Sequence, residues 1–429
     1  MIISLAPIDE RGRTLYCRVR CKVEKTKETN SMRINVNSGR PLEHLAHYSR
    51  ALRAGHWVLQ SGTTAIDRAG AVIGVGDVAK QVDAIVAIAE ESMGCAGGSL
   101  DDVVRSRIYL TDITLADQAG RALARHFKDV RPAATLIQIN ALARPAQLVE
   151  IEFDAIDGAR DRAVRFGSGR PSEEIYAYSR AVRVDDHVFI AGTTALEADG
   201  KVAYPGDMHQ QTRAVFDTIA SVAEAAGASL ADLVYTKTFV TAMARSHEQR
   251  VAKLDALGDV RPAGTLLGVP GLLMNEMLIE VEAEAIIGAS GNRKDVYTGK
   301  RNEHALGFAR AVESGPYVYV SGCTARDDAG GVFAPGDWAA QYDRCHETIS
   351  SVLGQLDMPL DDIVRRRTFT KHDAHMNRPY GEGPGWFENS RPTSLGCRVR
   401  SFVEPAMLVE VDAFAIRGAH QDIEWRQLG

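Results

Sequence analysis

Three glutamates that recur at one fixed spacing are the residues of this sequence best suited to proton-transfer chemistry. Glu150, Glu280 and Glu410 stand 130 residues apart, and each is followed two positions later by a second carboxylate. Around the first of them apolar and acidic residues alternate, as in a strand with one apolar and one acidic face. A carboxylate that takes a proton from water acts as a general base. We therefore predict that Glu150, Glu280 and Glu410 are catalytic.

The acidic face of this strand needs partners, because buried carboxylates are tolerated only when they are paired and hydrogen-bonded. Basic residues recur at the same spacing and are the expected partners: Arg50, Arg107 and Arg131; Arg180, Lys237 and Arg261; Arg310, Arg367 and Arg391. We predict three sheets that face one another around a pseudo-threefold axis, with ion pairs between them. The three arginines that precede proline (Arg131, Arg261 and Arg391) are expected to be structural.

The spacing of 130 residues runs through most of the chain. It relates Tyr48-Ser49-Arg50-Ala51 to Tyr178-Ser179-Arg180-Ala181 and to Phe308-Ala309-Arg310-Ala311. A period this long exceeds that of solenoid repeats, so each repeat is expected to be a domain. The predicted organisation is an N-terminal extension (1–32), three units (33–158, 165–288 and 295–418) and a C-terminal tail (419–429).

Hydrophobic periodicity indicates the elements of each unit. In the first, residues 48–53 and 57–62 form a hairpin, helical spacing begins after Asp77, and a second helix covers about 115–127. Strands are expected at 103–110, 135–139 and 148–156. The predicted fold class is α+β: three tandem domains, each a mixed sheet with two helices on one face.

Composition excludes several classes of protein. The net charge of -6 and the mixture of both signs provide no basic stripe for nucleic acid. No apolar run approaches the roughly 18 residues of a membrane span, and no signal peptide is apparent, so a cytoplasmic location is expected. The six cysteines are scattered and are expected to be free thiols. No residue pattern indicates a metal or a cofactor, and His372 and His375 are interpreted as part of a solvated loop.

As an ordered set, the repeated motifs resemble the RidA/YjgF family. The motifs are Tyr48, Ser61-Gly62, the Gly76-Asp77 helix start, Arg131-Pro132-Ala133 and Val149-Glu150-Ile151-Glu152. The resemblance implies the chorismate-mutase-like fold and clefts between adjacent domains that bind small carboxylates. In the active members those clefts hydrolyse enamines and imines to 2-oxo acids and ammonia.

The resemblance implies roles for individual residues but fails at one position. The deaminase pattern Arg-Pro-Ala-Arg ends in an arginine that grips the substrate carboxylate, and the matching residues here are Ala134, Gly264 and Ser394. The expected substrate-binding residues are Tyr48, Arg50, Ser61, Tyr178, Arg180, Arg310 and Ser321. The arginines among them either replace the missing guanidinium or only balance the three glutamates. For Ser61 the alternative to substrate binding is a hydroxyl that caps the glycine turn that follows it.

Three functions remain open. The first is a hydrolase of C=N bonds acting on a small, carboxylate-bearing metabolite, and the second is a non-catalytic binder of such molecules. A ring-opening amidase is a third, less favoured because the repeated Ser-Lys pairs it needs are missing. Only unit 1 keeps Tyr48, Ser61 and Glu150 together, so its cleft is expected to be the most complete. The expected assembly is a single-chain pseudotrimer that either stays monomeric or dimerises.

Overall fold

The computed structural model describes residues 22–23, 33–299, 302–379 and 381–429. The predicted N-terminal extension therefore lies outside the described residues, except for the short strand β1 (Lys22–Val23). Within the described ranges no helix is long and apolar enough to cross a membrane.

The first unit alternates strands and helices in the predicted order. Its elements are β2 (Arg33–Asn37), α1 (Pro41–Leu45), β3 (Ala51–Ala54), β4 (Trp57–Thr64), α2 (Val78–Cys95), β5 (Val103–Leu110), α3 (Ala116–Phe127), β6 (Ala133–Gln138) and β7 (Val149–Ile156). The strands are ordered β2-β3-β4-β7-β5-β6, and only the β5–β6 pair within this set is parallel. The predicted mixed sheet is confirmed.

The second and third units repeat this topology. Unit 2 comprises α4 (Ala159–Arg162), β8 (Val164–Phe166), α5 (Pro171–Ile175), β9 (Ala181–Val184), β10 (His187–Thr194), α6 (Met208–Ala225), β11 (Leu233–Val240), α7 (Ser246–Leu257), β12 (Ala263–Gly268) and β13 (Ile279–Ile286). Unit 3 comprises α8 (Ala289–Asn292), β14 (Lys294–Val296), α9 (Asn302–Ala305), β15 (Ala311–Ser314), β16 (Tyr317–Thr324), α10 (Trp338–Gly354), β17 (Ile363–Lys371), β18 (Thr393–Val399) and β19 (Val409–Ile416).

One expectation fails in unit 3, where a loop replaces the second helix. Residues 372–392 contain no helix in the part of this segment that the structure describes. Gly381, Gly383 and Gly385 all adopt positive φ, and Pro384 lies between them, so this stretch cannot continue a helix. Instead the ring of Trp386 stacks on His346 of α10, with 5.4 Å between ring centroids.

The core of each unit lies between its sheet and its helices. In unit 1, Val82 and Ile85 of α2 and Phe127 of α3 belong to the same buried cluster as Ile151 and Phe153 of β7. Ile151 and Phe153 are apolar members of the predicted alternation of apolar and acidic residues. The helices therefore cover one face of the sheet, and the acidic face points away from them.

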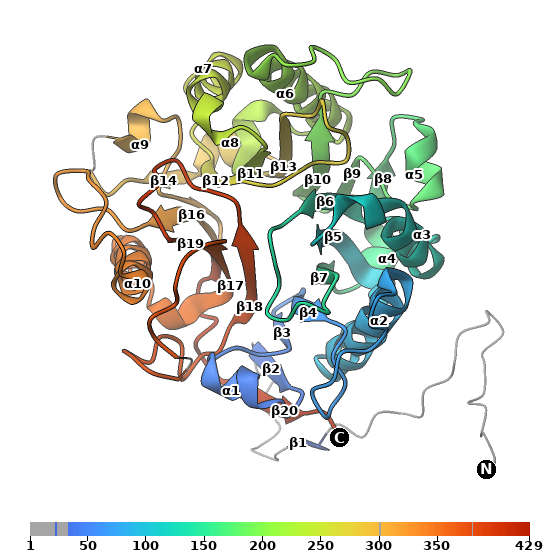
Figure 1. The fold of residues 1–429 in the computed structure, drawn as a ribbon, viewed down its shortest axis with the longest axis vertical. Helices are drawn as coiled ribbons and strands as arrows, with labels where there is room; N and C mark the ends of the chain where they lie inside the picture. The colour runs from blue at the N-terminus through green and yellow to red at the C-terminus, as the bar shows by residue number, and fades with distance from the viewer. Residues whose placement is uncertain (1–21, 24–32, 300–301, 380) are drawn as a thin grey trace.

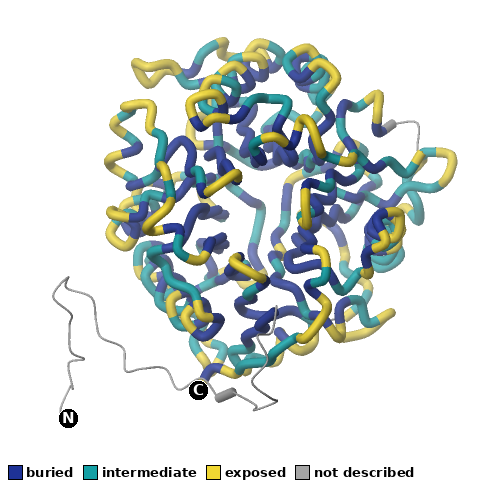
Figure 2. Tube along the Cα trace, turned by 180° about the vertical axis from the view of Figure 1, so that it is seen from behind, coloured by how far each residue is buried: buried dark blue, intermediate teal, exposed yellow. Residues whose placement is uncertain are grey.

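The three units lie around a common centre, with their sheets inside and their long helices outside (Figure 1). Strand β6 of unit 1 contacts β10 of unit 2, β12 contacts β16, and β18 of unit 3 contacts β4 of unit 1. The last strand, β20 (Ile423–Gln427), pairs in parallel with β2, so the predicted C-terminal tail joins the sheet of the first unit. Buried residues concentrate in the inner strands, and exposed residues lie mainly at the periphery (Figure 2).

The acidic strand faces meet at this centre and form ion pairs between units, as predicted. Arg107 of unit 1 donates to Glu282 of unit 2, Lys237 of unit 2 pairs with Asp412 of unit 3, and Arg367 of unit 3 pairs with Glu152 of unit 1. Two further arginines that were not predicted as partners, Arg105 and Arg365, pair with Glu284 and Asp154.

The other predicted cations do not take part in this network. Arg131 pairs with the exposed Glu174, Arg261 donates to the carbonyls of Gly258 and Val260, and Arg391 donates to that of Glu388. Arg131 and Arg391 adopt positive φ, consistent with the structural role expected for them.

The cysteines match the expectation of free thiols only in part. Cys323, Cys345 and Cys397 are free and buried, but Cys95 is disulfide-bonded. Sequence spacing provided no signal for this bond.

Candidate functional site

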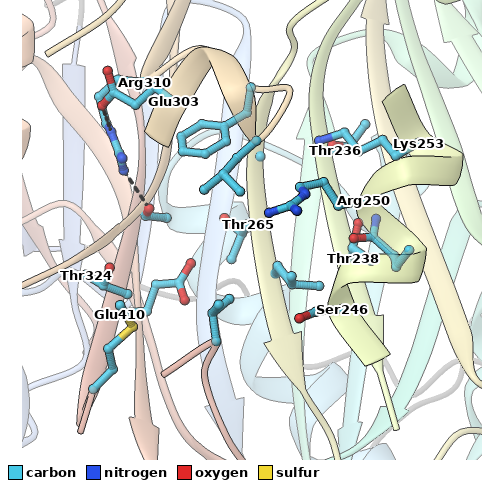
Figure 3. A pocket seen from close by; sticks show the side chains of 18 of the residues that line it. Thr236, Thr238, Ser246, Arg250, Lys253, Thr265, Glu303, Arg310, Thr324 and Glu410 are labelled. Atoms are coloured by element: carbon cyan, nitrogen blue, oxygen red, sulfur yellow. Dashed lines mark hydrogen bonds and ion pairs between the residues drawn. The ribbon is translucent and has the colours of Figure 1, made fainter. Parts of the chain in front are cut away.

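A cavity of about 210 Å³ lies between unit 2 and unit 3. Unit 2 contributes side chains from β11, α7 and β12, among them Thr236, Arg250 and Lys253, and unit 3 contributes Phe308, Arg310, Thr324 and Glu410 (Figure 3). Of the three predicted catalytic glutamates, Glu410 lines this cavity. The most complete site was expected at Glu150, in another cleft, and this stays a prediction.

The position of Glu410 is set by the register of two strands. Glu410 of β19 is opposite Thr324 of β16, just beyond a β-bulge between Val320 and Cys323. A Cβ atom on Gly322, within the bulge, would collide with the carboxylate of Glu410. Gly62 and Gly192 have the same relation to Glu150 and Glu280. The repeated glycine therefore makes room for the repeated glutamate.

Burial changes the acidity of all three glutamates. It raises the pKa of Glu150, Glu280 and Glu410 from 4.5 to about 8, and in each case desolvation of the charged form is the main cause. Arg310 and a backbone hydrogen bond from Leu266 of unit 2 act in the opposite direction on the pKa of Glu410. A carboxyl group with a pKa near neutrality can both donate and accept a proton, as an acid–base catalyst must.

The predicted substrate-binding arginines are held by other groups. Arg310 Nε donates to Glu303 Oε1 at 2.8 Å, and its Nη1 donates to the carbonyl of Gly322 at 2.8 Å. Arg50 binds Glu43 in the same way, whereas Arg180 donates to Gly192 and Thr193. Arg50 and Arg310 thus have a direct ionic partner, Glu43 or Glu303, that was not predicted. The charges of Arg50, Arg180 and Arg310 also lower the pKa of Glu150, Glu280 and Glu410, respectively.

That partner glutamate was detectable in the repeat. Glu43, Glu173 and Glu303 stand at the same position of the three units and are buried. Glu303 also accepts hydrogen bonds from the backbone N–H and hydroxyl of Thr298. Its role is to fix the loop before β15 and, with it, Arg310 at the wall of the cavity.

The hydroxyls of both predicted serines form hydrogen bonds across a boundary between units. The hydroxyl of Ser321 donates to the carbonyl of Ala309 at 2.6 Å and accepts from the N–H of Gly264 in unit 2 at 2.7 Å. Ser61 makes the same two bonds, to Ser49 and to Ser394 of unit 3. Both hydroxyls thereby join the edge of one unit to the strand that, in the deaminases, carries the carboxylate-binding arginine.

The predicted aromatic residues have different surroundings in the three clefts. The hydroxyl of Tyr48 accepts from Arg50 at 2.8 Å, and that of Tyr178 lies 3.1 Å from Ser172 Oγ. Phe308 lacks a hydroxyl and lies under the guanidinium of Arg310 at the cavity.

Side chains specific to one unit contact the neighbouring unit at the two other boundaries. Between units 1 and 2, the ring of Tyr176 lies 2.7 Å from the site of a Cβ atom on Gly120, and its hydroxyl donates to Asp117. Between units 3 and 1, the guanidinium of Arg366 donates to the carbonyl of Ala46. Position 236 of unit 2, which matches Arg366, holds a short threonine that lines the cavity.

Comparison with known proteins agrees with the repeat. A family model described as endoribonuclease L-PSP matches residues 39–157, 170–287 and 298–417, most of the chain, in three consecutive copies. The chain belongs to the RidA/YjgF family.

Individual RidA/YjgF relatives are single domains that match one unit. An uncharacterized protein of Streptomyces coelicolor is 34% identical over 131 residues, which is 29% of this chain and 92% of the relative. The 3-aminoacrylate deaminase RutC of Acinetobacter baylyi is 34% identical over 107 residues, covering 25% of this chain and 84% of the relative. A solved YjgF/YER057c/UK114-family structure from Mycobacterium tuberculosis is 34% identical, covers 29% of this chain and 99% of its own, and has a TM-score of 0.27.

Proposed function

We propose that the cavity between units 2 and 3 hydrolyses a C=N bond in a small metabolite, with Glu410 as the group that transfers protons. The observation that carries the proposal is a buried carboxyl on the cavity wall with a pKa of about 8. The similarity of one unit to a 3-aminoacrylate deaminase supports the same reaction class.

The reaction needs one group that acts first as an acid and then as a base. Protonated Glu410 gives its proton to the imine nitrogen, and the resulting carboxylate takes a proton from the water that attacks the imine carbon. The product of this step is a carbinolamine, and Glu410 is protonated again. A second transfer, from the carbinolamine hydroxyl to nitrogen through Glu410, breaks the C–N bond and releases ammonia and a carbonyl compound.

The second candidate is a non-catalytic binder of small molecules. It is favoured by the absence of the deaminase arginine at Ala134, Gly264 and Ser394. The retention of Arg310 by Glu303 also favours it, because Arg310 is then less able to turn toward a ligand.

A direct assay separates these candidates. An amino-acid oxidase generates an imine in the cuvette, and the disappearance of the imine is followed with and without the purified chain. Acceleration by the wild-type chain, lost in Glu410→Gln, is the expected result. No acceleration with any of a panel of amino acids, in a folded protein that still binds 2-oxo acids, would favour the binding function.

A further inference from the structure

Lys253 is a buried cation that the repeat does not predict. It lies on α7 of unit 2, has 8% of its surface exposed, and lines the cavity opposite unit 3 (Figure 3). Across the part of the chain that the structure describes, no hydrogen bond or ion pair of its amino group is found. A buried ammonium without a counter-charge is unfavourable, and here burial and the nearby Arg261 lower its pKa to about 8.

The neighbourhood of Lys253 is the place where the deaminases carry their arginine. The amino group of Lys253 lies 3.7 Å from the position that a Cβ atom on Gly264 would occupy. Gly264 matches the last residue of the deaminase motif and lines the same cavity. The lysine thus fills, from a helix, the space that a long side chain on β12 would otherwise enter.

The other units lack this arrangement. The residues that match Lys253 are Leu123 in unit 1 and Gly383 in unit 3. Leu123 is part of a hydrophobic core, and Gly383 belongs to the loop that replaces the second helix. A cation therefore occurs at this position in unit 2 only, and helix α7 of unit 2 borders the cavity described above.

Two other cations of the cavity have partners within the protein. Arg310 is paired with Glu303, and Arg326 with Glu404. Arg250, one turn before Lys253 on α7, also faces the cavity but is only half-buried (Figure 3). Lys253 is accordingly the buried positive charge whose neutralisation is left to a ligand.

We infer that Lys253 binds the acidic group of the ligand in the cavity between units 2 and 3, in place of the arginine absent at Gly264. The inference rests on the proposed function for the class of ligand, a small 2-oxo or 2-imino acid. It makes Lys253 a determinant of specificity, because an uncharged analogue would leave the ammonium unpaired.

The test is a binding measurement that needs no turnover. Pyruvate and its uncharged amide, pyruvamide, are titrated into the full chain by calorimetry, with Lys253→Leu as the main variant, because leucine is the residue unit 1 carries at this place. We expect pyruvate affinity to fall about tenfold or more, and pyruvamide affinity to stay unchanged. Lys201→Gln, which removes a charge that is 80% exposed, is the matched control and is expected to bind as wild type.

A second variant distinguishes loss of the positive charge from a folding defect as the cause of weaker binding. The double variant Lys253→Leu, Gly264→Arg returns a guanidinium to the cavity from β12, where a Cβ atom meets no atom closer than 3.5 Å. Recovery of pyruvate affinity in this variant would identify the lost charge as the cause. Wild-type affinity in a folded Lys253→Leu chain, or no pyruvate binding by the wild type, would overturn the inference. Lysine-dependent pyruvate binding without imine hydrolysis would leave the inference standing and reject the proposed reaction.

Discussion

Arg107 of unit 1 and Glu282 of unit 2 form a fully buried ion pair, with 2.7 Å between Nε and Oε1. The same guanidinium also pairs with Asp154 of its own unit, at 2.9 Å. Attraction to these carboxylates outweighs desolvation and raises the pKa of Arg107 far above its ordinary value. The pair joins two units at the centre of the molecule.

Arg107→Met is therefore expected to destabilise the fold by about 3–5 kcal/mol, because it leaves Glu282 buried without its main partner. Denaturant unfolding measures this loss. Arg107→Lys is the matched control, since unit 2 carries Lys237 at the same position, and it should cost clearly less. Equal stability of the two variants would show that the charge does not hold the units together.

Glu410→Gln is expected to lower turnover by about 100-fold or more, the contribution of a general acid–base group. The substitution keeps the side-chain volume, so circular dichroism should show an intact fold. Glu150→Gln and Glu280→Gln are the controls, in the two clefts where Arg366 and Tyr176 contact the neighbouring unit. Smaller losses of turnover are expected in these two variants. Similar losses in all three variants would contradict a single working cleft.

The three glutamates predict how stability depends on pH. Their folded pKa of about 8 lies above the ordinary 4.5, so the folded chain holds protons there that the unfolded chain has released. The free energy of unfolding should consequently decrease as the pH rises through this range and level off above about 8.

Other groups with shifted pKa values change the free energy of unfolding outside the upper part of this pH range. His187 and His346 have lowered pKa values, so they change the free energy of unfolding only below about pH 6.5. Lys237 and Lys253 have a folded pKa of about 8, so they change it only above that pH. The clearest comparison is urea unfolding between pH 6.5 and 8, for wild type and a Glu150→Gln, Glu280→Gln, Glu410→Gln variant. In the triple variant the free energy of unfolding should no longer decrease between these two pH values. The same pH dependence in the variant and the wild type would argue against raised pKa values of the three glutamates.

Ser321→Ala is expected to affect stability and not chemistry. It removes the acceptor of the half-buried Gly264 N–H, which should cost about 1 kcal/mol. Unit 2 has alanine at the matching position, Ala191, so the fold should tolerate the change. Thermal unfolding and the imine assay, run together, test the prediction. A large loss of turnover without a loss of stability would restore Ser321 as a substrate-binding residue.

The chain is expected to behave as one compact particle in solution. Its three units already bury their acidic strand faces against one another, so no further chain is needed to cover these faces. Light scattering should give the mass of one chain, 46.6 kDa, or of a dimer. A trimer of chains would contradict this assembly.

The sequence by itself determined the repeat, the mixed sheet of each unit and the place of the three glutamates. It could do so because a period of two fixes which side chains of a strand share a face, and because the 130-residue spacing preserves that pattern three times. Buried carboxylates such as Glu152 and Glu282 also required cations opposite them, so Arg107, Lys237 and Arg367 could be named as partners. The loop of unit 3 was less predictable, because its glycine-rich sequence shows no apolar residues at helical spacing.

Tertiary structure alone placed the described cavity between units 2 and 3 and brought Lys253 to its wall. The boundaries differ in residues from different units: Arg366 and Tyr176 contact the neighbouring unit at two of them, and Thr236 lines the cavity at the third. Lys253 and Gly264 are eleven positions apart on a helix and a strand, and Lys253 is part of no recurring motif. Their proximity arises only when α7 packs beside β12, and no spacing in the sequence encodes that distance.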